Sequence, residues 1–365
     1  MEKVLLLCLQ LGCPIEFSPA RYQLIQELRK QNYEIYVFYP GTIVNKEIRG
    51  QIQYLTNTLN LSKKDIRKKI MDIAPRHVIA FTYEDAVMLY NLPVVLKKTS
   101  FIYFNLEIYT PYMERYIQPK GFLFHTRCRA SYIINKVKEV IYAKQCKLFV
   151  IQDALRKRVA AKFYLSHSNT LLIPNSYIYC DEEKWGTDRY GMIYSGGVNK
   201  NILQSLAENM DALPDLPITF SGVTDEWFRT QYKKICKKHP SIEVHEQKLS
   251  PEAFTEYLKQ FAVGLIWYSP TRDENINNIG MSSGKFFKHL SLGQPVIVPE
   301  CPGLSRLVEK FNLGIVIRDT SELKEAYEKI MDHYSYYQKN IKYVYKNKFD
   351  YAKVIRPFLS CLKEI

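Results

Sequence analysis

The chain has 365 residues, of which 47% are apolar, and 51 Lys and Arg against 37 Asp and Glu leave a net charge of +14. One hydrophobic core seldom serves so long a chain, so we expect a folded protein of two domains. No run of about 18 apolar residues occurs, and the short apolar run of residues 4–9 predicts a buried strand, not a signal peptide. The composition therefore predicts neither a membrane span nor secretion.

Apolar runs typical of buried strands alternate with amphipathic helical patterns along the first half of the chain. The predicted strands are residues 4–10, 34–40, 77–82, 100–105 and 147–153, and the predicted helices include 19–31 and 62–72. Alternation of this kind predicts a parallel sheet wound with helices.

The same pattern restarts after a polar, turn-rich stretch at residues 173–191, which follows the strand-like "TLLIP" at residues 170–174. Its predicted strands are residues 191–197, 217–222, 242–247, 263–269, 294–300 and 313–318. We therefore expect an α/β protein with two doubly wound, Rossmann-like domains, at residues 1–175 and 176–338, and a helical tail at 339–365 that packs back across the domain interface. The carboxyl ends of the two sheets are expected to face one cleft, where such sheets bind ligands.

One stretch of the second half, "NIGMSSGKFFKHLSLGQPVIV" at residues 278–298, predicts a loop, a helix, a turn and a strand. Ser282 and Ser283 can cap the helix, Gly293 can end it, and Lys285 lies in its first turn. The exposed N–H groups of a helix start suit a phosphate or diphosphate. An ordinary serine-capped unit without a ligand explains the same residues equally well.

The positive charge is concentrated in the first half of the chain. Residues 1–180 hold 26 Lys and Arg against 13 Asp and Glu, which leaves +13, whereas residues 181–365 leave +1. No nucleic-acid motif accompanies this excess, so it favours contact with an anionic membrane over nucleic acid, with solvated helix faces as the alternative. The densest cluster, Lys63, Lys64, Arg67, Lys68 and Lys69, is expected to make the first contact.

The eight cysteines are scattered, with neither Cys-x-x-Cys pairs nor histidines at zinc spacing. This fits a reducing compartment and buried thiols, and it predicts no metal site and no cofactor. We expect a cytoplasmic protein, with peripheral contact at the inner face of the membrane as a further hypothesis.

Several stretches resemble nucleotide-sugar-dependent glycosyltransferases of the GT-B fold, and within them the mostly retaining family 4. The resemblance covers most of the chain. It is carried by "LFVIQDALRKRV", "LLIPNS", "IYSGGVNKN", "KLSPEAFTEYLKQFAVGLIWY" and "SSGKFFKHLSLGQPVIVPECPGLSRLVEKFNLGIVI". The resemblance implies a second domain that binds a UDP- or GDP-sugar donor and a first domain that binds a glycan or lipid-linked acceptor.

The resemblance also implies a donor site in the second domain. For Gly196 and Gly197, a tight strand-to-helix turn without a ligand is the alternative explanation. The donor-binding residues would be Gly196, Gly197, Asn199, Gln247, Leu249, Gly280, Met281, Ser282, Ser283 and Lys288. Lys200 and Lys285 would neutralise the leaving diphosphate, and Glu107 would contact the acceptor hydroxyl or act as a base. A structural loop glutamate that pairs with a nearby arginine is the alternative for Glu107.

The chain departs from the family pattern at four residues in two stretches. Family 4 enzymes carry two glutamates eight residues apart, the later one on the donor ribose, and Gly280 and Lys288 hold those places here. In "FIYFNLEIY", Phe104 and Leu106 replace a family Asp and His, and only Glu107 remains. Ribose recognition therefore differs from the family standard.

The leading hypothesis is a glycosyltransferase of bacterial surface polysaccharide synthesis. It is expected to be metal-independent, since no Asp-x-Asp motif is present, and the resemblance implies retention of the anomeric configuration. Two alternatives remain. The first is a GT-B protein that binds nucleotide sugars without transferase activity, which Gly280 and Lys288 favour. The second is a nucleotide-sugar epimerase, against which the basic first domain speaks.

Overall fold

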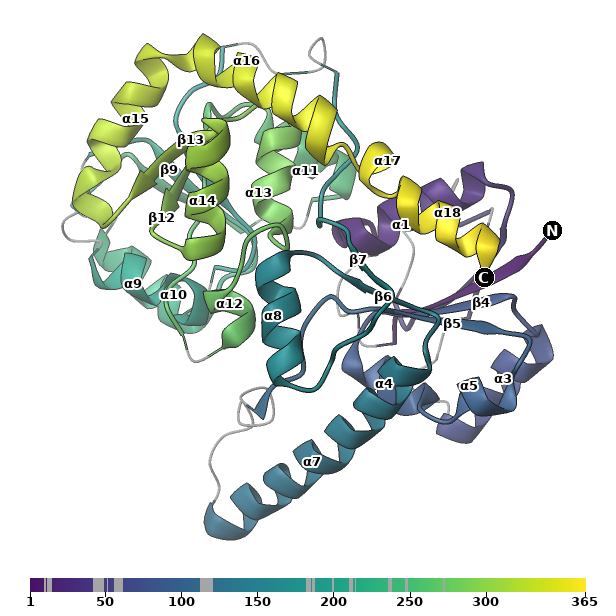
Figure 1. The fold of residues 1–365 in the computed structure, drawn as a ribbon. Helices are drawn as coiled ribbons and strands as arrows, with labels where there is room; N and C mark the ends of the chain where they lie inside the picture. Colours follow the sequence, from purple (N-terminus) through teal and green to yellow (C-terminus); the bar gives the residue numbers. More distant parts are fainter. Residues whose placement is uncertain are drawn as a thin grey trace. The chain divides into compact units, whose positions relative to one another are not determined.

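The computed structural model divides the chain into two compact units, and each is described by itself (Figure 1). The first unit comprises residues 1–174, 273–275 and 354–365, and the second comprises residues 175–272 and 276–353. The residues that the structure describes are 1–9, 11, 15–41, 49–50, 52–55, 62–111, 121–181, 185, 188–198, 200–209, 213, 215–235, 238–246, 249–271 and 273–365.

The first unit is built on a parallel sheet, which has seven strands in the described part of the chain. The strands are β1 (Lys3–Leu7), β2 (Glu34–Phe38), β3 (Gln53–Leu55), β4 (His77–Ala80), β5 (Ser100–Phe104), β6 (Leu148–Ile151) and β7 (Thr170–Leu172). Their order is β3-β2-β1-β4-β5-β6-β7, so the chain winds outward in both directions from β1. Strands buried on both faces need continuous apolar sequence, which explains runs such as residues 4–7.

Helices cover both faces of this sheet. They are α1 (Pro19–Lys30), α3 (Lys63–Ile73), α4 (Tyr83–Leu89), α5 (Leu92–Val95), α7 (Gly121–Gln145), α8 (Ala154–Lys162) and α18 (Arg356–Glu364). Side chains of α3, α4, α5, α7 and α8 share one core with alternate strand residues such as Val78 and Phe101. On the other face Phe104 meets Phe358 of α18 edge to face, with ring centroids 5.9 Å apart.

The second unit repeats the design with a parallel sheet that has six strands among the described residues. They are β8 (Met192–Ser195), β9 (Ile218–Ser221), β10 (Ile242–His245), β11 (Val263–Leu265), β12 (Val296–Pro299) and β13 (Gly314–Ile317), in the order β10-β9-β8-β11-β12-β13. Its helices are α9 (Lys200–Glu208), α10 (Glu226–Ile235), α11 (Pro251–Leu258), α13 (Gly284–Ser291), α14 (Pro302–Phe311), α15 (Leu323–Asp332) and α16 (Tyr334–Val344). The short α12 (Glu274–Asn277) is divided between the two units after Asn275.

Two apolar clusters hold these layers together, one on each face of the second sheet. Met192, Phe220 and Leu265 pack with α9, α10 and α15, whereas Val296 and Val298 pack with α13, α14 and α16. The switch in strand order between β8 and β11 lies at the middle of this sheet. In open α/β sheets, ligands bind beyond the carboxyl ends of the strands at such a switch point.

The last part of the chain is helical, as its sequence predicts. A π-helical turn (Tyr345–Phe349) and the short α17 (Tyr351–Val354) follow α16, and α18 then joins the first unit. There the Ser100 hydroxyl donates a hydrogen bond of 2.7 Å to the carbonyl oxygen of Ile365. The chain therefore begins and ends in the same unit.

Every strand predicted from the sequence is present, although each is shorter than its apolar run. The strand β3 was not predicted. It has three residues and the polar sequence Gln-Tyr-Leu, and it pairs only with β2 at the edge of the sheet. An edge strand buries little surface, so its sequence needs no apolar run.

Gly222 should be the most sensitive glycine of the second sheet. Its φ of +145° disfavours any other residue, and an added Cβ would lie 1.9 Å from the carbonyl oxygen of Gly196. We expect Gly222→Ala to lower the free energy of unfolding by more than about 1 kcal/mol in chemical denaturation. Gly50→Ala is the control, because a Cβ there meets no atom within 4 Å. Equal stability of the two variants would contradict this packing.

Candidate nucleotide-sugar site

The loop that leaves β8 lies against the neighbouring strand end. Gly196 has a φ of +126°, and its N–H donates a hydrogen bond of 2.9 Å to the carbonyl oxygen of Ser221, the last residue of β9. Because Gly222 approaches the same backbone without a side chain, the two strand ends stay in close contact. The predicted glycine pair thus begins a tightly packed turn at the switch point of the sheet.

The start of α13 is capped as the sequence predicts. The Ser283 hydroxyl accepts a hydrogen bond of 3.3 Å from the N–H of Phe286 and lies 2.9 Å from the Tyr268 hydroxyl. The side chain of Ser282, 8% exposed, has a hydroxyl oxygen with no hydrogen-bond partner among the described residues. Two serines and a helix start therefore meet at one point, and one of their hydroxyls is uncommitted.

Lys285 is held between two tyrosine rings. Its Nζ donates a hydrogen bond of 2.7 Å to the Tyr194 hydroxyl and lies 4.2 Å from the ring centroid of Tyr194 and 4.6 Å from that of Tyr268. A Cβ built on Gly196 would lie 3.6 Å from this ammonium. The structure therefore brings Gly196 close to Lys285, although Gly196 lies 89 residues earlier in the sequence.

The environment of Lys285 disfavours its charge. Burial lowers the pKa of the ammonium from 10.5 to about 7, and no carboxylate contributes to the shift. A group in this state gains its full charge when an anion arrives, because a nearby negative charge raises a lysine pKa. The arrangement is therefore suited to an anionic ligand and would take up a proton on binding it.

The segment after β7 supports the loop before α13. The Asn175 N–H donates a hydrogen bond of 2.8 Å to the carbonyl oxygen of Met281, and the Asn175 side-chain amide donates one of 3.2 Å to that of Ser282. Asn175 of "LLIPNS" and the Met281–Ser282 backbone of "GMSSGK" are thus neighbours in the second unit. This contact gives a physical reason for the occurrence of both in one sequence pattern.

Lys288 stands at the position where family 4 has the ribose-binding glutamate, and here it contacts a side chain of the protein. Its Nζ donates a hydrogen bond of 2.7 Å to Thr255 Oγ1 on α11 and lies 4.9 Å from the ring centroid of Tyr177. Burial lowers its pKa from 10.5 to about 8. Lys288 therefore ties α13 to α11 in this structure.

The "LGQP" turn after α13 has a structural explanation that the sequence alone did not suggest. Gln294 accepts a hydrogen bond of 2.7 Å from His289 Nδ1 and donates to the carbonyl oxygens of Leu258 and Phe261. Buried His289 also lies 3.1 Å from the hydroxyl of Ser195 at the end of β8. Its pKa is lowered from 6.5 to about 4, mainly by burial, so a neutral imidazole supports this strand end.

The structure gives fewer contacts for the other predicted donor-site residues. The carbonyl oxygen of Gly197 accepts a hydrogen bond from Tyr194, and that of buried Gly280 accepts one from the Ser283 N–H. Leu249 is half-buried one residue before the cap of α11. Three predictions lie outside the described residues, wholly or in their side chains: Asn199, Gln247 and the side chain of Lys200, whose backbone begins α9.

Glu107 belongs to the first unit, in the loop after β5, where it is exposed. Its carbonyl oxygen accepts a hydrogen bond of 3.2 Å from the side chain of Asn105. Glu84, at the start of α4, is a second carboxylate near it that the sequence did not single out. The Glu84 pKa is raised mainly by burial and also by the negative charge of Glu107. Two carboxylates thus lie beyond the carboxyl ends of the adjacent strands β4 and β5.

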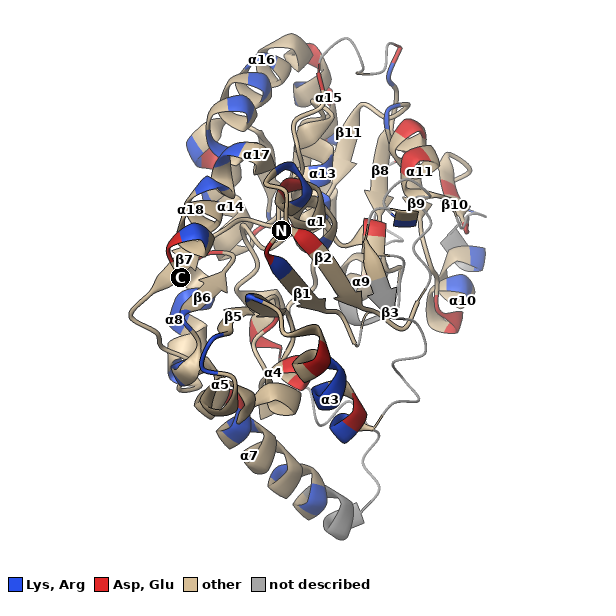
Figure 2. Cartoon of the chain, turned by 90° about the vertical axis from the view of Figure 1, so that its right-hand side faces the viewer, with Lys and Arg blue, Asp and Glu red and all other residues tan. Residues whose placement is uncertain are grey.

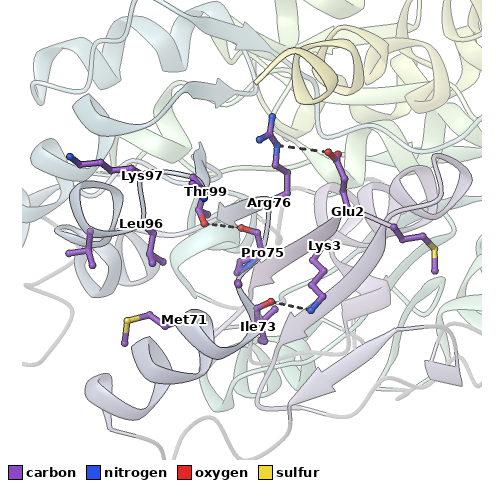
Figure 3. A pocket seen from close by; sticks show the side chains of 13 residues that line it. Glu2, Lys3, Met71, Ile73, Pro75, Arg76, Leu96, Lys97 and Thr99 are labelled. Atoms are coloured by element: carbon purple, nitrogen blue, oxygen red, sulfur yellow. Dashed lines mark hydrogen bonds and ion pairs between the residues drawn. The ribbon is translucent and has the colours of Figure 1, made fainter.

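A cavity of about 680 Å³ lies in the first unit near the amino ends of β1, β4 and β5 (Figure 3). Lys3, Arg76 and Lys97 are among its lining residues, and Arg76 approaches Glu2 at 4.0 Å. None of the predicted site residues lines this cavity. It lies at the end of the strands opposite to Glu84 and Glu107, and so is separate from the predicted sites.

The described residues contain neither a group of side chains that could hold a metal ion nor a helix that could span a membrane. No group of three or more His, Cys, Asp and Glu side chains there could hold a metal ion. None of the helices described combines the length and the apolar character that a membrane span requires.

Known glycosyltransferases resemble this chain in sequence over part of the second unit and in fold over its whole length. Residues 192–348 match the family model of the glucosyltransferase 3-like C-terminal domain. The structure of Anabaena HepE in complex with UDP-glucose resembles the whole chain with a TM-score of 0.73 at 11% identity, covering 100% of both chains. The chain has the GT-B fold. The resemblance to GT-B glycosyltransferases predicted from the sequence is thereby confirmed.

Other GT-B structures extend the likeness. Sucrose-phosphate synthase from Thermosynechococcus elongatus has a TM-score of 0.69 at 12% identity, covering 100% of this chain and 99% of its own. WaaG, a glycosyltransferase of lipopolysaccharide biosynthesis, has a TM-score of 0.66 at 13% identity, covering 98% and 99%. No curated protein matches the chain in sequence. At such low identity, the structural likeness establishes the GT-B fold alone.

The tyrosine-enclosed Lys285 should be titratable near neutral pH. We expect its acetylation by acetic anhydride, followed by mass spectrometry, to rise with a midpoint near pH 7, because burial favours its neutral form. Free Nα-acetyl-lysine in the same reaction is the control, with an expected midpoint near the ordinary lysine pKa of about 10.4. Coincident midpoints for the two lysines would show that the ammonium is solvated.

Proposed function

We propose that this chain is a glycosyltransferase that transfers a sugar from a nucleotide-sugar donor to a glycan or lipid-linked acceptor in bacterial surface polysaccharide synthesis. The observation that carries the proposal is the position of Lys285. Its ammonium lies between Tyr194 and Tyr268, beside Gly196 and in the first turn of α13. Such an arrangement at the switch point of the sheet suits a phosphate, and this supports the proposal.

The chemistry of transfer explains why a cation is needed there. The bond between the anomeric carbon and the diphosphate oxygen breaks, and the nucleoside diphosphate leaves with the electron pair. A new bond forms from the acceptor oxygen, which loses its proton. Negative charge therefore grows on the diphosphate, and Lys285 and the uncommitted Ser282 hydroxyl would stabilise it. Lys200 is proposed to add a second positive charge.

A UDP-sugar is the proposed donor. HepE, which has the same fold, was solved with UDP and with UDP-glucose. The predicted base-binding loop includes Leu249 and Gln247. Such a loop would hold the base through backbone atoms, so the identity of its side chains does not indicate whether the base is uracil or guanine. A GDP-sugar therefore stays the second choice, and retention of the anomeric configuration is inferred from the family resemblance.

In the first unit, Glu107 is proposed to contact the acceptor hydroxyl, and Glu84 is added as a second candidate. The raised pKa of Glu84 would favour it as a proton acceptor, since a base works best when its pKa approaches the working pH. The acceptor would be bound by this unit. Its cationic surface is proposed to hold the protein at the inner face of the cytoplasmic membrane.

A second candidate function is nucleotide-sugar binding without transfer. It is favoured by Lys288, which stands where family 4 has a ribose-binding glutamate and instead donates to Thr255. Thermal-shift screening of nucleotide sugars, followed by hydrolysis assays on those that bind, separates the candidates. Binding without turnover would support the binding protein, and formation of an epimer would support a nucleotide-sugar epimerase.

Loss of a lysine from the site should weaken nucleotide binding. We expect Lys285→Ala and Lys200→Ala each to reduce affinity for UDP in titration calorimetry by ~1.5–3 kcal/mol, about 10- to 100-fold, because each removes a charge-assisted contact. Lys329→Ala, which removes the same charge from exposed α15, should bind UDP as the parent does. The affinity of the parent should also fall as pH rises above about 7, as Lys285 loses its proton. Unchanged affinity in both site variants would refute the phosphate site.

Activity should persist after chelation of divalent cations. With Lys285, Lys200 and the start of α13 stabilising the diphosphate, EDTA is expected to leave hydrolysis of the donor within about twofold of its untreated rate. The measurement is release of UDP with EDTA, compared with added Mg²⁺ or Mn²⁺. Complete loss of activity on chelation and its return with either ion would reject the metal-independent mechanism.

A further inference from the structure

The helix α7 of the first unit carries an apolar stripe that faces solvent. Ile133, Ile134, Val137 and Ile141 are 55%, 54%, 53% and 37% exposed. Residues 133, 137 and 141 follow one another at four-residue spacing, and 134 and 141 are two turns apart, so all four share one face. The opposite face, with Tyr142 and Ala143, packs into the core of the first unit.

Positive charge surrounds this stripe. Arg129 lies one turn before Ile133 and Lys144 lies three residues after Ile141, and both are exposed. Exposed Arg127 and half-buried Lys138 lie seven residues before and four residues after Ile134. The stripe thus has a cation near each end and others along its side.

No acidic side chain among the described residues 126–145 offsets these cations. The helix contains one acid, Glu139, which is fully buried and pairs with Lys136 at 2.6 Å. Figure 2 shows α7 as a tan helix crossed by blue segments, whereas α3 carries blue and red together. An apolar stripe bordered by cations alone has the pattern of a helix that lies in a membrane interface.

The geometry points to α7 as the membrane-contacting element of this protein: the Ile133, Ile134, Val137 and Ile141 side chains enter an anionic lipid leaflet while Arg127, Arg129, Lys138 and Lys144 meet its head groups. This inference deepens the proposed peripheral contact and rests on it. It does not depend on the donor site, which belongs to the other unit.

Charge complementarity favours lipid over a second copy of the chain. Two α7 stripes packed face to face would bring cations toward cations, and like charges across an interface oppose association. An anionic leaflet instead attracts each Lys or Arg near its surface, over a distance of about 8 Å at physiological salt. The apolar side chains then gain burial that no described residue of the protein gives them.

The cluster on α3, which the sequence had favoured for first contact, is less suited. Arg67 donates hydrogen bonds through Nε and Nη2 to the carbonyl oxygen of Met88, and it lies over the ring of Tyr90. Asp65 and Asp72 lie on the same helix. The cations Lys63, Lys64 and Lys68 are exposed but accompany a single exposed apolar side chain, that of Met71. This cluster therefore supplies the charge control for the experiment.

The test is co-sedimentation of the full chain with vesicles of neutral phosphatidylcholine or with vesicles that also contain phosphatidylglycerol. The parent should bind the anionic vesicles and leave them as salt rises. Replacing Ile133, Ile134, Val137 and Ile141 with Gln should weaken binding by at least about tenfold, as should replacing the four α7 cations with Gln. Replacing Lys63, Lys64 and Lys68 with Gln should have a smaller effect.

A matched apolar control comes from the second unit, where Val223, Tyr336 and Tyr343 are 75%, 53% and 67% exposed. Their replacement with Gln should leave vesicle binding unchanged. All variants should keep the parent's thermal midpoint and UDP affinity, because the substituted side chains are exposed or half-buried and lie outside the donor site. A variant that loses UDP affinity as well would be excluded as misfolded.

Insertion itself can be measured with Val137→Trp and lipids brominated on the acyl chain. We expect its fluorescence to be quenched more strongly than that of the parent on anionic vesicles. Equal binding to neutral and anionic vesicles, unchanged binding of the apolar α7 variant, or absence of quenching would each overturn the inference. So would a parent dimer that the apolar α7 variant converts to a monomer without any vesicle binding, since a second copy would then cover the stripe.

Discussion

The candidate donor site depends on one interaction, the enclosure of the Lys285 ammonium by Tyr194 and Tyr268. Two ring faces attract a cation but do not neutralise it, and a hydroxyl supplies only one hydrogen bond. Burial therefore lowers the pKa of Lys285 without a compensating carboxylate. The result is a group poised to become charged when a diphosphate arrives, which costs the ligand-free protein less than a permanently charged buried lysine would.

The surrounding packing serves to hold that ammonium in place. Tyr194 belongs to β8, and its hydroxyl is fixed because it also donates to the carbonyl oxygen of Gly197. Tyr268 is fixed by Ser283, which caps the helix that carries Lys285. Neutral His289 joins the same helix to the end of β8 through Ser195. A strand, a loop and a helix thus converge on one side chain, and each is fixed by a hydrogen bond that does not involve the ligand.

The first unit has a different physical character. Its described helices include one, α7, that is apolar on the face toward the core and also on a face toward solvent. A helix that is apolar on every side is normally buried completely. Here the exposed face is bordered by cations. Part of the positive charge counted along the sequence is therefore placed beside one apolar surface once the helix is folded. The proposed donor site and the proposed membrane-contacting helix therefore belong to separate units of one chain.

The sequence by itself determined the two α/β units, their central strands, the capped helix α13 and the place of Lys285 in its first turn, because these depend on local periodicity, capping and spacing. It missed the edge strand β3, whose polar residues bury too little surface to leave a pattern. Only the tertiary structure decided which side chains enclose Lys285, since Tyr194 and Tyr268 lie 91 and 17 residues before it. It also decided that Lys288 contacts Thr255, that Glu84 lies near Glu107, and that the apolar stripe of α7 faces solvent. Each of these depends on which surfaces meet when distant segments pack, and periodicity within one segment carries no information about its neighbours.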